Sequence, residues 1–139
     1  MARFLAVPLA LLLASCATTY AITPQVAPAS TDFATAQRVE VHLDNFSFEP
    51  RSISLAAGRP VVLVLINDAE GGHNFSAPAF FGDAQVAAED AARIAGGYVE
   101  VHGGTNVELR LIPAAGGYDV DCTHLGHSVL GMSGSIVVR

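Results

Sequence analysis

The sequence lacks lysine altogether, and its seven basic residues are all arginines. Thirteen aspartates and glutamates outnumber them, which gives a formal net charge of -6 at pH 7. Proteins that bind nucleic acid neutralise its phosphates with clusters of basic side chains, and the sequence has no such cluster. We therefore expect no nucleic-acid partner, and the acidic composition favours docking partners that are basic or apolar.

Sulfur is almost as scarce as positive charge. The chain has two cysteines, Cys16 and Cys122, and Met132 is the only methionine besides the initiator. Two of the five histidines lie with Cys122 and Met132 in the stretch CTHLGHSVLGM, residues 122–132. A packed core requires none of these residue types in this order, so the stretch indicates chemistry rather than packing.

The N-terminus reads as a targeting segment. Arg3 precedes a continuous apolar run from Phe4 to Leu13, which is too short to span a bilayer and is typical of a secretory signal. The following LASC resembles the lipobox of bacterial lipoproteins, and this resemblance implies that Cys16 becomes a lipidated first residue. The alternative is an ordinary signal peptide in which Cys16 is incidental.

These features divide the chain into three parts. We expect a lipoprotein signal peptide over residues 1–15, a lipidated cysteine and flexible tether over 16–37, and a folded domain over 38–139. The tether is rich in Ala, Thr, Pro and Ser without a period, and its average reach would be roughly 25 Å. The predicted location is the cell envelope, with the domain facing the periplasm or the exterior. Ala17, in place of an aspartate, favours the outer membrane, and the lipid would be the only contact with the membrane.

Beyond the tether the hydrophobic period changes to two. RVEVHLD alternates apolar and polar residues, and SISLAAG, VVLVLI, YVEVHGG, VELRLIP, GGYDVDC and SGSIVVR follow with turn residues between them. Many short strands with this punctuation predict an all-β, antiparallel Greek-key sandwich. GDAQVAAEDAARIAGG carries a helical stripe instead, so we expect one short inserted helix from about Ala84 to Ala95, with Asp83 as its N-cap.

Strand alternation also predicts where the second cysteine points. Tyr118, Val120 and Cys122 share the apolar face of GGYDVDC, so the thiol should face inward. If Cys16 is lipidated, Cys122 is a lone thiol in an exported protein, where unpaired thiols are usually oxidised, and a bound metal would protect it.

A thiolate, an imidazole and a thioether on one loop are ligands suited to copper, whose usual complement is two histidines, one cysteine and a weak axial methionine. His127 and Met132 follow Cys122 in the loop, and HNF at 73–75 supplies the missing histidine at the end of the strand that begins at Val61. His124 is a second candidate within the loop, although the spacing favours His127. The other histidines, His42 and His102, read as surface residues of strands.

Taken together, these motifs resemble those of the cupredoxins, the small blue copper proteins of plastocyanin and azurin type. The resemblance covers residues 38–139 and rests on matches at Asn67, His73, Asn74, Cys122, Thr123, Gly126, His127, Met132 and Gly134. It implies one type 1 copper ion with His73, Cys122 and His127 as equatorial ligands and Met132 as the axial ligand. It also implies that Asn74 ties the two ligand loops together, with its backbone N–H near the thiolate. Leu125 and His124 depart from the family pattern. The alternative without metal is a buried free cysteine, a packing methionine and two surface histidines.

The function implied by the resemblance is electron transfer on the periplasmic side, with copper cycling between Cu(II) and Cu(I), and not catalysis. The partners would be an unidentified redox donor and acceptor, and the protein would be a monomer. Electrons would pass through the edge of His127 within an apolar patch, for which the candidates are Leu125, Val129, Leu130, Ala77, Pro78 and Phe80. The alternative function is a copper storage or delivery module of the cell envelope that uses the same ligands.

Overall fold

The computed structural model describes residues 21–139. The predicted signal peptide, Cys16 and the first part of the tether therefore lie outside the described residues. Among residues 21–139, no helix combines the length and apolar character needed to cross a membrane.

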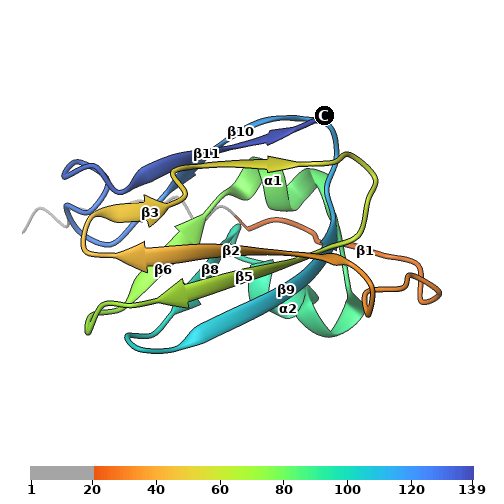
Figure 1. The fold of residues 1–139 in the computed structure, drawn as a ribbon, viewed down its shortest axis with the longest axis horizontal. Coiled ribbons are helices and arrows are strands. Elements are labelled where there is room, and N and C mark those ends of the chain that lie inside the picture. Colours follow the sequence, from red (N-terminus) through yellow and green to blue (C-terminus); the bar gives the residue numbers. More distant parts are fainter. Residues whose placement is uncertain (1–20) are drawn as a thin grey trace, which may run out of the picture.

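The described chain forms a sandwich of two β-sheets (Figure 1). The first sheet has the strand order β1(Gln25–Val26), β7(Gln85–Val86), β9(Asn106–Ile112), β5(Val61–Asn67), β2(Gln37–Asp44), β3(Ser47–Glu49). The second has the order β4(Ser52–Leu55), β11(Ser133–Val138), β10(Gly116–Asp121), β6(His73–Ser76), β8(Tyr98–Val101). The inward-facing residues of both sheets form one hydrophobic core, as the alternating patterns predict.

The predicted all-β sandwich is confirmed, but its sheets are mixed rather than antiparallel throughout. β2 runs parallel to β5, β11 runs parallel to β4, and β1 runs parallel to β7, whereas the remaining pairs are antiparallel. Alternation along a strand reveals which face is buried but not which strand lies beside it or in what direction. The relative direction of neighbouring strands could therefore not be predicted from the alternating pattern.

The predicted short helical insertion is confirmed, but it is not the single helix expected over 84–95. The segment after β6 instead contains α1(Pro78–Asp83), strand β7, the 3₁₀ turn η1(Ala88–Asp90) and the short helix α2(Ala91–Ile94). Asp83 is the last residue of α1 and not an N-cap. Gln85 and Val86 are extended because they pair with both β1 and β9, and this pairing interrupts the helical stripe.

Residues 22–27 of the expected tether lie against the sandwich. The amide of Ile22 donates to the carbonyl of Ala95 at 2.9 Å, and the amide of Ala27 donates to the carbonyl of Val86 at 2.8 Å. Ala27 is buried, and Ile22 packs against the core. Strand β1 has only two residues, which is too few to produce a recognisable alternating pattern. The sequence of this segment therefore did not indicate that it pairs with the sheet.

Candidate metal centre

Cys122 immediately follows β10, whose inward face carries Tyr118 and Val120. All three side chains are buried in the core, and Cys122 has no exposed surface. The predicted inward orientation of the thiol is therefore confirmed. Because β10 and β11 are antiparallel neighbours that pair Asp121 with Ser133, residues 122–132 form a loop that closes on itself. The amide of Cys122 donates to the carbonyl of Met132 at 3.1 Å and seals its base.

Backbone hydrogen bonds hold the loop in a compact turn. The amide of His127 donates to the carbonyl of His124, and the amide of Met132 donates to the carbonyl of His127, each at 3.0 Å. Gly126 and Gly131 have φ angles of 81° and 110°, a region that favours glycine. Met132 ends the loop with its side chain fully buried in the same core cluster as Cys122.

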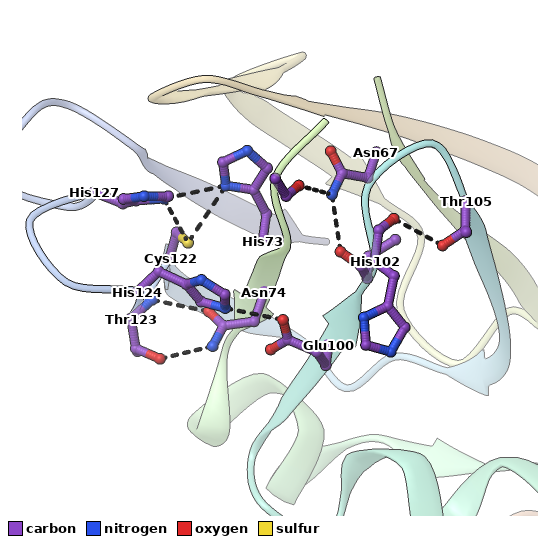
Figure 2. A network of polar contacts seen from close by, with 12 residues as sticks. Asn67, His73, Asn74, Glu100, His102, Thr105, Cys122, Thr123, His124 and His127 are labelled. Carbon is purple, nitrogen blue, oxygen red and sulfur yellow. Dashed lines mark hydrogen bonds and ion pairs between the residues drawn. The ribbon is translucent and has the colours of Figure 1, made fainter. Parts of the chain in front are cut away.

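His73 comes from a different segment than the sequence indicated. It is the first residue of β6 in the second sheet, not the end of the strand that begins at Val61 in the first. Asn67, the last residue of β5, shapes the connecting turn: its Nδ2 donates to the carbonyls of Gly71 at 2.9 Å and Val101 at 2.8 Å, and its Oδ1 accepts from the amide of Ala69 at 3.0 Å. We call these three hydrogen bonds the Asn67 bracket, and Figure 2 shows Asn67 beside His73. The turn therefore delivers His73 to the site from the side opposite the loop.

Three donor atoms meet between these segments. The Nδ1 atoms of His73 and His127 lie 3.1 Å apart, and the Sγ of Cys122 lies 3.9 Å and 3.5 Å from them, respectively (Figure 2). These three residues form the group in the described chain whose donor atoms are close enough to hold a metal ion. The point equidistant from the three atoms is about 2.0 Å from each, which is close to typical metal–imidazole distances of roughly 2.0–2.1 Å and metal–thiolate distances of about 2.3 Å.

The orientation of His73 supports the same interpretation. Its Nε2 is buried and has no hydrogen-bond partner, while its Nδ1 faces the other two donors. Burial lowers the pKa of His73, and repulsion from a proton on the nearby His127 or His124 would lower it further, against the opposing effect of Asp44 and Glu100. The imidazole is thereby held in the neutral form that binds a metal.

The predicted link between the two ligand segments is present. The side chain of Asn74 donates from Nδ2 to the hydroxyl of Thr123 at 2.7 Å, and its Oδ1 accepts from the amide of Thr123 at 2.8 Å (Figure 2). Asn74 follows His73 and Thr123 follows Cys122, so this pair of hydrogen bonds ties the two ligand positions together. The proximity of the Asn74 backbone N–H to the sulfur stays a prediction.

The other histidines do not join the donor set. His124 lies beside it but turns its Nε2 to the carboxylate of Glu100 at 2.9 Å, and Glu100 was not singled out in the sequence. His42 is half-exposed and bonds through Nδ1 to Asp68 at 2.6 Å, and His102 is exposed. The geometry therefore favours His127 over His124 as the ligand from the loop.

The edge of His127 is partly exposed at the end of the sandwich. In the same loop, the side chains of Leu125, Val129 and Leu130 are 101%, 89% and 63% exposed. Phe46 adds to this surface: it is 41% exposed, and its ring meets that of His127 edge-on, with centroids 5.3 Å apart. We call these four residues the apolar end patch.

Part of the predicted patch was wrong, and one member was missed. Ala77 and Phe80 are buried in the core and Pro78 is only half-buried at the start of α1, so Ala77 and Phe80 contribute nothing to the exposed surface. Phe46 occupies the tight turn between β2 and β3 with a φ of 64°. An aromatic residue at the tip of such a turn was the available signal, because a ring there has no core to enter.

The comparisons with known proteins agree with this geometry. Residues 35–139 match the model of the copper binding proteins of the plastocyanin/azurin family. An auracyanin B structure aligns with a TM-score of 0.58 at 23% identity, covering 86% of this chain and 99% of that one. The auracyanin of Roseiflexus castenholzii aligns with a TM-score of 0.56 at 17% identity and covers 75% and 98%. Auracyanin A of Chloroflexus aurantiacus, described as a blue copper protein, aligns with a TM-score of 0.50 at 20% identity and covers 73% and 99%.

No curated protein sequence gives a significant match. The chain belongs to the plastocyanin/azurin family of copper-binding proteins, because the family model covers three quarters of its length. Its cofactor is copper, and His73, Cys122, His127 and Met132 are arranged as a type 1 copper site.

Proposed function

We propose that this protein is an electron carrier on the periplasmic or exterior side of the cell envelope and is not an enzyme. The observation that carries the proposal is the buried donor set, in which two imidazoles and a thiolate surround a single point. When bound there, copper supplies one-electron chemistry between Cu(II) and Cu(I). With Met132 as the fourth ligand, no coordination position is left open for a substrate.

The protein around this point is suited to electron transfer because it restrains the ligands. His73 is held by the bracket of Asn67, Cys122 by β10, and His127 by its backbone bond to His124. A site that is fixed in advance undergoes little rearrangement when its charge changes. Only the edge of His127 reaches the surface, so it offers the shortest route for an electron.

The first experiment is a copper titration of the soluble domain that begins after Cys16. We expect an intense copper–thiolate absorption in the visible spectrum and a narrow hyperfine splitting in the electron paramagnetic resonance spectrum. Both should be lost in Cys122→Ser and retained in His102→Ala, because His102 is an exposed histidine outside the donor set. Reversible redox cycling without loss of copper would support a carrier of electrons, whereas ready transfer of copper to an acceptor apoprotein would favour storage or delivery. An ordinary tetragonal Cu(II) signal would contradict the proposal.

We further propose that redox donors and acceptors dock on the apolar end patch. Phe46 contacts the ring of His127, the ligand whose edge reaches solvent, and the other three residues of the patch are exposed in the loop that carries this ligand. The chain is acidic overall, and Asp44 and Glu100 lie close enough to act on the charge of His73. A fitting partner is thus a redox protein whose contact surface is apolar at its centre and basic around it.

This docking proposal is tested with Leu125→Glu and Leu130→Glu. Both residues are exposed, so the variants should fold and keep the copper spectrum of the unmodified protein. The rate of electron exchange with the partner should fall at least tenfold. Val26→Glu is the matched control, because Val26 is 56% exposed on β1, outside the apolar end patch. Equal rates in the patch variants and the control would remove the patch from the mechanism.

The attachment to the envelope is proposed to be a lipid on Cys16, with the outer membrane as the favoured location and a monomeric domain outside it. The LASC motif and the preceding apolar run support this assignment. Labelling of the whole protein with a radioactive fatty acid in the producing cell should be lost in Cys16→Ala. Label that persists in this variant would refute the anchor.

A further inference from the structure

His124 and Glu100 form a link that the family ligand set does not require. The Nε2 of His124 donates to the Oε1 of Glu100 at 2.9 Å, since a carboxylate can only accept. The two side chains are 34% and 37% exposed, so the contact is partly shielded from water. His124 belongs to the ligand loop, and Glu100 belongs to β8, the edge strand of the second sheet.

The register of the sheet places this link beside the one made by Asn74. Asn74 of β6 and Glu100 of β8 are directly opposed partners, so their side chains leave the same face of the sheet. Asn74 forms hydrogen bonds with Thr123, and Glu100 forms one with His124. Two neighbouring strands are thus bonded to two consecutive loop residues just after Cys122 (Figure 2). The start of the loop is therefore fixed twice.

The link also leads to the second loop ligand. The carbonyl of His124 accepts the amide of His127 at 3.0 Å, so the position of the His124 backbone sets that of His127. The rings of His124 and His127 lie 5.5 Å apart, and those of His124 and His73 lie 6.4 Å apart. His124 thus lies close to both ligand imidazoles.

A third segment is fitted to the same contact. A Cβ at Gly72 would lie 3.2 Å from Oε1 of Glu100 and 3.5 Å from Cε1 of His124. Gly72 directly precedes His73, so the pair packs over the turn that carries this ligand and leaves little room for a side chain. Both ligand-bearing segments consequently meet at the Glu100–His124 contact.

We propose that Glu100 is a positioning residue of the copper site, which acts through His124 to hold the ligand loop in its metal-binding conformation before the metal arrives. The inference rests on the proposed copper function of the loop, but its first test needs no metal. Without Glu100, His124 would be free to turn toward solvent, and the loop would be closed mainly by the hydrogen bonds of Asn74 and by its own backbone bonds.

Amide hydrogen exchange of the copper-free domain provides that test. In Glu100→Ala, the exchange rates of the amides of His127, Leu130 and Met132 should rise roughly threefold to tenfold, the effect of losing one partly exposed hydrogen bond. Glu100→Gln keeps an oxygen acceptor, so its exchange rates should lie between those of the unmodified protein and those of Glu100→Ala. Glu108→Ala is the matched control, because Glu108 forms an exposed ion pair with Arg38 on the first sheet. Unchanged loop exchange in Glu100→Ala, or an equal rise in Glu108→Ala, would overturn the proposal.

Copper binding supplies a second measurement. The Glu100→Ala domain should release copper to a chelator severalfold faster and show an altered visible spectrum, whereas Glu108→Ala should match the unmodified protein. His124→Ala and the double variant Glu100→Ala/His124→Ala should give equal rates, because Glu100 acts only through His124. If the double variant is faster than His124→Ala, Glu100 does not act through this contact. A protein without a blue copper spectrum would refute the proposed electron-transfer function while leaving the exchange result interpretable.

Discussion

The Asn67 bracket allows a sharp test of how the turn before His73 is held. Asn67 is 1% exposed, and its side chain makes three hydrogen bonds, with Gly71, Val101 and Ala69. A hydrogen bond within a protein contributes about 1 kcal/mol net. Asn67→Ala should therefore lower the free energy of unfolding of the copper-free domain by about 2–3 kcal/mol in urea titrations.

Asn67→Asp sharpens the test because it preserves the shape of the side chain. An ionised aspartate would place an oxygen 2.8 Å from one carbonyl and 2.9 Å from another, where Nδ2 now donates. The loss of stability at pH 7 should exceed that of the alanine variant, because the carboxylate oxygen would face two carbonyl oxygens with no proton between them. Asn106→Ala, at an exposed asparagine, should change stability by less than about 0.5 kcal/mol. A loss below about 1 kcal/mol in Asn67→Ala, or an Asp variant more stable than the Ala variant, would refute the reasoning.

Three further predictions concern the rest of the sandwich. Asp90 is buried, and its carboxylate accepts hydrogen bonds from Nε and the backbone amide of Arg110 at 2.9 and 3.1 Å. Asp90→Ala should therefore lower the free energy of unfolding by about 1–3 kcal/mol. A smaller loss in urea titrations would show that the pair is not needed for stability. Burial raises the pKa of the Tyr118 phenol, with the nearby Asp83 carboxylate adding to it. The protonated phenol therefore stabilises the folded state fully below the pKa that tyrosine has in the unfolded chain. This contribution is lost as the pH rises through the higher pKa of the folded state. Ultraviolet titration should show a late-ionising phenol that is missing in Tyr118→Phe, and an identical titration of the two proteins would contradict this. The amides of Ile22 and Ala27 should resist hydrogen exchange if their segment is paired with the sandwich, and exchange at the rate of an unstructured peptide would exclude that pairing.

The sequence was most informative where a strong local rule applied. Alternation in β10 placed Cys122 inward, and the order of ligand types identified the loop and His73. These features depend on neighbours along the chain, and a short sequence window contains them. The direction of β2 against β5 depends on partners distant in the sequence, so alternation carried no information about it.

The surroundings of the site were harder to predict for the same reason. Glu100 reaches His124 across 24 positions in the sequence, and Phe46 meets His127 across the sandwich end. The helical stripe at 84–95 is present in the sequence, but the pairing of Gln85 and Val86 with strands on both sides outweighed its weak helix propensity. Short helices gain most of their stability from tertiary contacts, and these override the local pattern.

The bond between Ile22 and Ala95 changes how an anchored domain would sit on a membrane. If Cys16 carries the proposed lipid, the first fixed point of the fold is six positions away, so the free chain could extend at most about 20 Å. Ala95 lies three positions before β8, and the far end of β8 pairs with His73, so the lipid-bearing segment would attach near the opposite end of β8, roughly 10 Å along the strand from the copper site. The domain would then move within a thin layer above the lipid, and its partners would have to search that layer rather than the open compartment.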